Sequence, residues 1–194
     1  PDYGYRTGIN KTMLDHVRGV VKTLTKKTRL KKNELVLDIA SNDGSLLNFY
    51  NKNITTFGID PILDKYIGEY KNINYKISDF FSAKSIINKI KKKFKIITAL
   101  SVFYDTIDPN KFIKDAKSLL SKDGIFLLEF ADLASIIENK MFDTICHEHL
   151  EYYSLQSLEY LLNKHNLEVF DIEQNNINGG SIRVFIKFKD CKKF

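Results

Sequence analysis

The chain of 194 residues fits one domain, and its 43% hydrophobic content is enough to bury a sizeable core. The formal net charge is +6, but only four of the 30 basic residues are arginine. Arginine is better suited than lysine to bidentate hydrogen bonds with nucleic-acid bases and phosphates. The charge therefore gives little support to nucleic-acid binding, and we expect a small-molecule partner.

The cysteines and the hydropathy exclude several further classes. Cys146 and Cys191 lie far apart without partners at metal-ligand spacing, which argues against a disulfide framework or a metal site. No stretch approaches the roughly 20 apolar residues of a membrane span, and the N-terminus lacks a signal peptide's apolar core. We expect a cytoplasmic protein that contacts no membrane. Because the chain begins at Pro1, it is treated as a possible fragment of a longer protein.

The first elements are predicted to be a helical lead-in (1–30) and the beginning of a sheet core (31–194). Apolar residues recur at helical spacing over 11–25, which predicts an amphipathic helix. The apolar run 35–39 carries an acid near its end and is followed by small polar residues and then by the segment 46–50. This pattern predicts a strand, a tight turn and a helix.

The alternation of strands and helices then continues, as in parallel βαβ units. Further strands are predicted over 56–60, 73–77, 94–100 and 125–130, with helical segments over 63–70, 85–93 and 110–120. Gly124 is expected to end the helix before the fifth strand. An irregular stretch is expected from there to His149.

The C-terminal part of the sequence predicts a capped helix and a hairpin. Ser154 is placed to cap a helix with an apolar face of leucines, Leu155 to Leu162. The strands 167–172 and 181–188 are separated by a turn, Asn178-Gly179-Gly180, that suits an antiparallel hairpin. We therefore expect an α/β fold with a doubly wound, mostly parallel sheet and an antiparallel strand near one edge.

Ligands of such sheets bind beyond the carboxyl ends of the strands. Asp38 lies at the end of the first strand. The following turn holds Ala40, Ser41, Asn42 and Gly44, and its small residues would let a ligand approach the backbone closely. This turn is the centre of the predicted cofactor site.

The ends of the next three strands add polar groups to this site. Asp60 follows Asp38 by 22 residues and is placed to bind ribose hydroxyls. The spacing fits NAD as well, but the turn is not G-x-G-x-x-G and a terminal hairpin is foreign to a dinucleotide fold. Polar groups and an aromatic ring for adenine come from Ser78, Asp79, Phe80 and Ser101.

Each of these residues also has an ordinary structural explanation. Asp38 suits a strand-end cap, Asp60 a turn acid before Pro61, and Phe80 a core side chain. Their order along the chain, each at a strand end, nevertheless favours a nucleoside cofactor.

Several segments resemble the nucleotide-sugar (dTDP-keto-deoxysugar) C-methyltransferases. They are residues 5–10, 38–44, 58–61, 103–105, 142–153 and 178–181. The resemblance runs over nearly the whole chain, and its most distinctive part is the His-Glu-His sequence at 147–149. It implies S-adenosylmethionine as cofactor and a seven-stranded sheet of the class I methyltransferase (Rossmann-like) type.

The resemblance also implies catalytic roles. In this family a histidine removes a proton from the carbon next to a ketone, and the resulting enolate attacks the methyl group. His149 is then the base, and Glu148 beside it contacts or orients the substrate. Tyr5 matches an N-terminal active-site tyrosine, and Tyr104 is a further candidate. Cys146 stands where some relatives have a tyrosine, so another group would have to supply that hydroxyl.

Three alternatives remain open in the sequence. His147 and His149 would point the same way in an extended chain, where they could pack or bind a metal. The same cofactor site would serve O- or N-methylation of another small molecule. Family members are larger, with a zinc module before this domain and a further domain after it. The chain would therefore also suit a cofactor-binding module that is inactive without its flanking domains.

Overall fold

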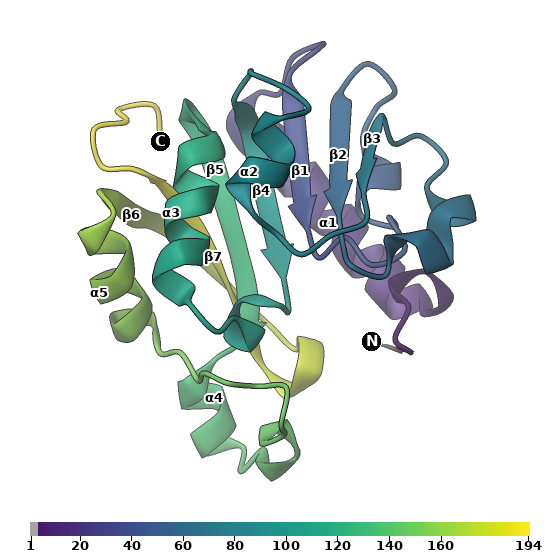
Figure 1. Ribbon diagram of the computed structural model, residues 1–194. Coiled ribbons are helices and arrows are strands. Elements are labelled where there is room, and N and C mark those ends of the chain that lie inside the picture. Colours follow the sequence, from purple (N-terminus) through teal and green to yellow (C-terminus); the bar gives the residue numbers. More distant parts are fainter. Residues whose placement is uncertain (1–3) are drawn as a thin grey trace.

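The computed structural model describes residues 4–194 and contains one seven-stranded sheet (Figure 1). The strands are β1 (Leu35–Ile39), β2 (Thr55–Ile59), β3 (Tyr75–Ile77), β4 (Phe94–Leu100), β5 (Leu120–Ala131), β6 (Leu167–Asn175) and β7 (Ser181–Phe188). Their order is β3-β2-β1-β4-β5-β7-β6. The first five pair in parallel, whereas β7 is antiparallel to β5 and β6. The predicted doubly wound sheet with a terminal hairpin is confirmed.

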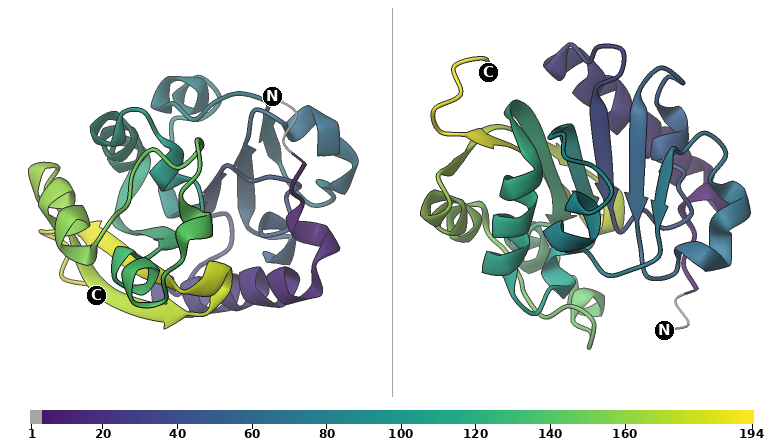
Figure 2. Two further views of the ribbon diagram at one scale, coloured as in Figure 1. Left: turned by 90° about the horizontal axis from the view of Figure 1, so that it is seen from below. Right: turned by 45° about the horizontal axis from the view of Figure 1, so that its top comes forward.

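Helices cover both faces of the sheet (Figure 2). On one face α1 (Lys11–Thr28) buries Val20 and Leu24 against Val36 of β1 and Ile96 of β4. On the other face lie α2 (Ala83–Ile87), α3 (Pro109–Leu119) and α5 (Leu155–Lys164). A further short helix, α4 (Leu133–Glu138), protrudes beyond the carboxyl end of β5 (Figure 1). No helix within residues 4–194 has the length and apolar character to cross a membrane.

The helix caps follow from side chains flanking each helix. The Asn10 side chain accepts hydrogen bonds from the backbone N–H groups of Thr12 (2.9 Å) and Met13 (3.3 Å) at the start of α1. Ser154 caps α5 as predicted, and Ser157 completes a reciprocal capping box with it. Both helices are confirmed, and α1 continues three residues beyond the predicted end.

A buried cluster of His16, Glu129 and Arg183 joins α1 to the hairpin end of the sheet. Glu129 of β5 lies opposite Arg183 of β7 and accepts a 2.8 Å hydrogen bond from its Nε. The other carboxylate oxygen of Glu129 lies 2.5 Å from Nε2 of His16 in α1. Since buried charges need partners, this cluster fixes the position of α1 on the sheet.

Gly124 does not end a helix, which corrects the prediction. The chain passes directly from α3 into β5, and Gly124 lies inside that strand. A Cβ atom at Gly124 would lie 2.8 Å from Oγ of Ser121 and 3.0 Å from the backbone oxygen of Lys95. The glycine is therefore explained by close approach to the neighbouring strand.

Other boundaries also differ from expectation. The helix expected over 85–93 starts earlier, because Ser82 caps it, and it ends at Ile87. The helical segments expected over 46–50 and 63–70 are 3-10 turns, Leu47–Phe49 and Leu63–Glu69. The stretch expected to be irregular contains α4 and a 3-10 turn, Phe142–Thr144.

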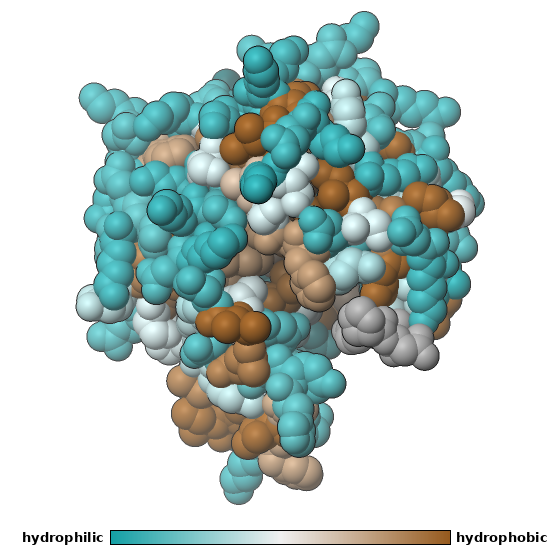
Figure 3. All heavy atoms as spheres, in the orientation of Figure 1, coloured by the Kyte–Doolittle hydropathy of each residue, from teal (hydrophilic) through white to brown (hydrophobic). Residues whose placement is uncertain are grey.

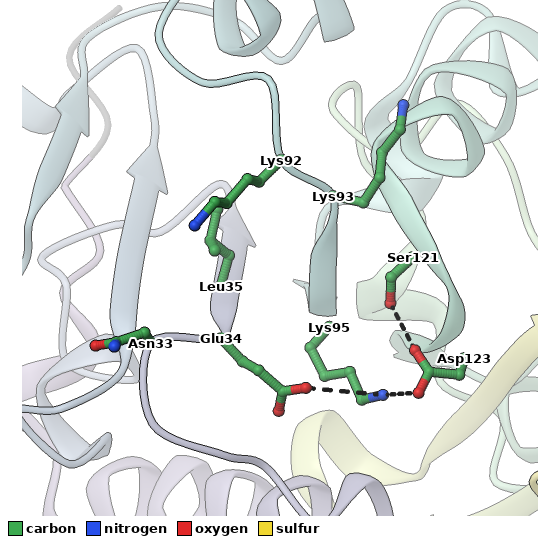
Figure 4. Close-up of a pocket in the computed structure, with 8 residues that line it drawn as sticks. All are labelled: Asn33, Glu34, Leu35, Lys92, Lys93, Lys95, Ser121 and Asp123. Carbon is green, nitrogen blue, oxygen red and sulfur yellow. Dashed lines mark hydrogen bonds and ion pairs between the residues drawn. The ribbon is translucent and has the colours of Figure 1, made fainter.

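A lysine-lined cavity of about 220 Å³ lies at the amino end of the parallel strands, opposite the predicted cofactor site (Figure 4). Lys95 of β4 points between Glu34 and Asp123. Its Nζ donates a hydrogen bond to Asp123 and lies 4.0 Å from Glu34. Lys193 also donates to Asp123, at 3.3 Å. These ion pairs connect β4, β5, the residue before β1 and the C-terminal segment.

This cluster predicts an acid-sensitive part of the stability. The hydrogen bond from Lys95 lowers the pKa of Asp123 from 3.8 to about 2. The folded state thus binds its proton less readily than the unfolded chain, so the stabilisation is present above pH 4 and lost as pH falls toward 2. The midpoint of urea unfolding, measured from pH 6 to 2, should fall less steeply in Asp123→Asn than in the wild type. Asp190→Asn, which removes an exposed carboxylate, should follow the wild type.

Candidate cofactor and active site

The turn after β1 has an unusual backbone that brings its peptide groups to the edge of the sheet. Ala40, Asn42 and Gly44 have φ angles of 56°, 51° and 75°, in the left-handed region. Glycine adopts this region freely and asparagine tolerates it, whereas alanine is strained there. A Cβ at Gly44 would also lie 2.8 Å from Ile73. The shape of the turn therefore requires a glycine at position 44, and it holds Ala40 in a strained conformation.

Asp38 is buried in the sheet directly before this turn. Its register partner in β4 is Thr98, whose hydroxyl donates a 2.5 Å hydrogen bond to Oδ1 of Asp38. Burial raises the pKa of Asp38 to about 7, the hydrogen bond from Thr98 opposes this rise, and the charge of Asp60 adds to it. A carboxyl group with such a pKa is poised to ionise when a cationic ligand binds.

Asp60 lies one residue beyond β2 and is tied to the same turn. Its two oxygens accept hydrogen bonds from the backbone N–H groups of Asn42 (2.9 Å) and Ile62 (2.8 Å). Burial raises the pKa of Asp60, and these two hydrogen bonds oppose the rise. A carboxylate can accept about four hydrogen bonds, so capacity for two ribose hydroxyls remains.

The side chains of Ser41 and Asn42 are engaged within the protein. The Ser41 hydroxyl lies 2.8 Å from the Tyr70 hydroxyl, which donates to the backbone oxygen of Asn42 at 2.7 Å. The Asn42 amide contacts the N-terminal segment. The prediction that these residues bind cofactor therefore rests on their backbone, whereas their side chains hold the turn in shape.

The N-terminal segment lies against this turn. The Asn42 side chain donates to the backbone oxygen of Tyr5 (2.9 Å) and accepts from the N–H of Thr7 (3.1 Å). The N–H of Gly8 donates to Asp43 at 2.8 Å, and a Cβ at Gly8 would lie 2.7 Å from that carboxylate. The structure thus brings Tyr5, predicted to be catalytic, next to the predicted cofactor site.

The residues predicted to contact adenine lie beyond β3 and are exposed. The Asp79 carboxylate accepts hydrogen bonds from the backbone of Phe80 (2.8 Å) and from the Ser85 hydroxyl (2.9 Å). Phe80 is 69% exposed, so the alternative that it belongs to the core is wrong. Ser78 is also exposed. Contact of Ser78, Asp79 and Phe80 with adenine stays a prediction.

Ser101 connects the end of β4 to the hairpin turn. It has a φ angle of 52°, and its N–H donates to the backbone oxygen of Glu129 at 2.8 Å. The Asn178 amide donates to the Ser101 hydroxyl at 3.5 Å. The Asn-Gly-Gly turn therefore reaches the carboxyl end of β4, which places it beside the predicted site.

The segment with the His-Glu-His sequence leaves and rejoins the core at the end of β5. The N–H of Leu133 donates to the backbone oxygen of Tyr153 at 3.0 Å, which closes the excursion. Within it, the N–H groups of Leu150 and Glu151 donate to the backbone oxygen of Tyr104, at 3.0 and 3.1 Å. The segment is thereby attached to the turn Phe103–Asp105, which directly follows β4.

His149 is held more firmly than its neighbours. Its Nδ1 lies 2.7 Å from the backbone oxygen of Thr144, and its ring packs against Tyr104 at 4.4 Å between centroids. It is half-buried, whereas Cys146, His147 and Glu148 are exposed. His147 and Glu148 form a turn, so the chain is not extended here as one alternative assumed. Within residues 4–194 no group of three potential metal ligands is found.

Apolar side chains gather on the protruding α4 region, at the lower edge of Figure 3. The most exposed are Phe142 (81%), Ile145 (71%) and Ile137 (68%), and Leu150 is half exposed. These side chains flank the His-Glu-His sequence. The predicted catalytic segment therefore lies next to an apolar surface.

The sequence did not identify three residues of this region. Thr98 is a single polar residue in the apolar run 96–100, which was an available signal. Asp105 lies in the segment 103–105 that resembles the family, but it was given no role. Tyr70 had no signal, because its contact with Asn42 depends on how the turn after β2 folds back.

Comparison with known proteins finds one protein family whose sequence pattern matches this chain, and many solved structures with a similar fold. The family described as "Methyltransferase domain" matches residues 3–172. The C-methyltransferase NovU of Streptomyces niveus is 28% identical over 188 residues, which cover 94% of this chain and 44% of that relative. The chain thus spans less than half the length of this relative.

Two solved structures illustrate the similarity of the fold. Magnesium protoporphyrin IX methyltransferase from Synechocystis, with bound S-adenosylhomocysteine, has a TM-score of 0.67 at 14% identity, covering 97% of this chain and 90% of that one. An S-adenosylmethionine-dependent methyltransferase from Clostridium acetobutylicum also has a TM-score of 0.67 at 14% identity, with coverages of 90% and 92%. The predicted class I methyltransferase fold is confirmed.

Proposed function

Because this chain belongs to the methyltransferase-domain family, we propose that it is an S-adenosylmethionine-dependent methyltransferase that methylates a carbon next to the ketone of a nucleotide-linked deoxysugar. In this proposal His149 is the general base. The supporting observation is the contact of its Nδ1 with the Thr144 carbonyl. A carbonyl only accepts, so the neutral ring carries its proton on Nδ1 and its lone pair on Nε2.

The residues at the strand ends fit the cofactor. Asp38 is a buried carboxyl group suited to the cationic methionine part, and Asp60 retains acceptor capacity for the ribose. The backbone of the turn at 40–44 can approach a ligand closely because its residues are small. When bound, S-adenosylmethionine supplies the methyl group as an electrophile.

The protein's own residues would act on the sugar. Nε2 of His149 takes the proton from the carbon next to the ketone, and the electron pair of the broken C–H bond forms an enolate. The enolate carbon would then bond to the methyl group as the bond from methyl to sulfur breaks, and the sulfur would keep the electron pair of that bond. In this proposal Tyr5 would donate a hydrogen bond to the enolate oxygen. Burial raises the pKa of its hydroxyl, the hydrogen bond with Thr7 opposes the rise, and the charge of Asp43 adds to it. The phenol thus stays protonated, and Glu148 is left to contact or orient the sugar.

The named relative supports carbon as the methylated atom. NovU is described as a C-methyltransferase, and its similarity covers nearly all of this chain. Since the chain spans less than half of that protein, we propose that additional domains help to hold the nucleotide sugar. A lone domain would then bind the cofactor more readily than the acceptor.

The position of the transferred methyl group tests this function. The protein should be incubated with S-adenosylmethionine carrying a ¹³C-methyl group and a panel of dTDP-linked keto-deoxysugars. We expect the product NMR spectrum to show the label attached to carbon. A label on oxygen or nitrogen of another acceptor, with none on any sugar carbon, would contradict the proposal. Cofactor binding without sugar binding would favour the binding-module alternative.

A further inference from the structure

The turn Phe103–Asp105 after β4 packs directly against the predicted base. The backbone oxygen of Tyr104 accepts two hydrogen bonds, from Leu150 and Glu151, which follow His149 in sequence. The Tyr104 and His149 rings meet at an angle of 59°. Asp105, the next residue of this turn, is near enough to the imidazole for the two groups to interact electrostatically.

The Asp105 carboxyl group has an unusual environment. Its Oδ1 is buried and has no hydrogen-bond partner within residues 4–194. Burial raises the pKa of Asp105 to about 6, the nearby His149 opposes this rise, and Glu148 adds to it. A buried, unpartnered carboxylate oxygen is costly, and it is often retained for an electrostatic role.

On the basis of the proposed function, we propose that Asp105 is a positioning residue whose carboxylate makes His149 a stronger base and stabilises its imidazolium form. The proton from the substrate carbon goes to Nε2 of His149, while the other ring proton stays on Nδ1 and is donated in a hydrogen bond to the Thr144 carbonyl. Asp105 itself gains no proton and remains ionised. Its negative charge favours the charged ring, because opposite charges at short range stabilise each other.

The pH dependence follows from the groups that face the imidazole. Asp105 lies on the turn after β4 and Glu148 on the segment that contains His149, and the charge of Glu148 raises the pKa of Asp105. The Tyr104 ring packs against the imidazole from the same turn as Asp105. Removing the charge of Asp105 should lower the pKa of His149, so that the base becomes neutral at lower pH but is weaker.

NMR titration of the histidine rings tests this inference on the whole chain without any acceptor. We expect the pKa of His149 to be lower by about 0.5 to 1 in Asp105→Asn than in the wild type. His149→Gln assigns the resonance. Asp143→Asn, which neutralises an exposed carboxylate in the same segment, is the matched control and should leave the pKa unchanged. Asp105→Glu, which keeps the charge, should restore most of the effect.

An unchanged pKa in a folded Asp105→Asn protein would overturn the inference, as would an equal change in Asp143→Asn. The titration is independent of methyl transfer, so a failure of the proposed function would leave this result unaffected. With a keto-sugar acceptor, the acid limb of the pH–rate profile should move to lower pH in Asp105→Asn. The plateau rate should fall about 2- to 3-fold, because a weaker base removes the proton more slowly.

Discussion

Asp38→Asn is expected to stabilise the cofactor-free protein and to abolish most of its affinity for S-adenosylmethionine. Burial raises the pKa of Asp38 to about 7, so the folded state binds a proton more readily than the unfolded chain. Stability therefore falls as pH rises from about 4 to 7, the reverse of the Asp123 case. Asparagine keeps an oxygen to accept the Thr98 hydrogen bond but removes the buried charge.

The buried charge of Asp38 sets the expected change in stability and the expected change in cofactor affinity. At pH 8 its removal should stabilise the fold by on the order of 1 to 4 kcal/mol, which corresponds to several degrees in melting temperature. Loss of a charge-assisted contact should weaken cofactor binding about 10- to 100-fold. Calorimetry of unfolding and of cofactor binding measures the two effects separately.

Asp43→Asn provides the matched control in the same turn. The Asp43 carboxylate is buried but accepts hydrogen bonds from the Gly8 N–H and from both the N–H and the hydroxyl of Ser45. Replacing Asp43 with asparagine should weaken these hydrogen bonds and lower the melting temperature. If Asp38→Asn destabilised the protein as well, the raised pKa of Asp38 would be contradicted. If the variant bound cofactor with unchanged affinity, the assignment of Asp38 to the cofactor site would be wrong.

His149→Ala is expected to lower kcat about 100- to 10,000-fold, the usual range for loss of a general base. Cofactor affinity should change little, because His149 is held by Thr144 and Tyr104 rather than by the turn after β1. Steady-state kinetics and calorimetry with S-adenosylhomocysteine measure the two quantities.

His147→Ala is the control for this substitution, since His147 is exposed two residues away and lies in the adjoining turn. Its kcat should stay within a few-fold of the wild type. Equal losses in the two variants would point to a structural role of the segment. Retention of most activity in His149→Ala would exclude His149 as the base.

The sequence predicted the sheet well because its strands are short apolar runs bounded by polar residues. The acids at strand ends, Asp38 and Asp60, were found for the same reason: each ends an apolar run. The hairpin followed from the Asn-Gly-Gly turn. Gly124 misled the prediction, because a glycine required by close strand packing has the same sequence signal as one that ends a helix.

The contacts that shape the site were less accessible from sequence. Asn42 holds the N-terminal segment through Tyr5 and Thr7, which are more than 30 residues away. Asp105 interacts with His149 only because the excursion between Leu133 and Tyr153 returns to the turn after β4. Local patterns carry no information on such long-range pairings, whereas strand register and loop closure determine them.

The most direct test of base chemistry at a sugar carbon is deuterium exchange. The protein, together with any flanking domains, should be incubated in D₂O with a dTDP-linked keto-deoxysugar and S-adenosylhomocysteine, so that proton removal occurs without methyl transfer. We predict exchange at the carbon next to the ketone, catalysed by the wild type and by His147→Ala and lost in His149→Ala. Carbon methylation without exchange in the wild type, or exchange that persists in His149→Ala, would contradict this account.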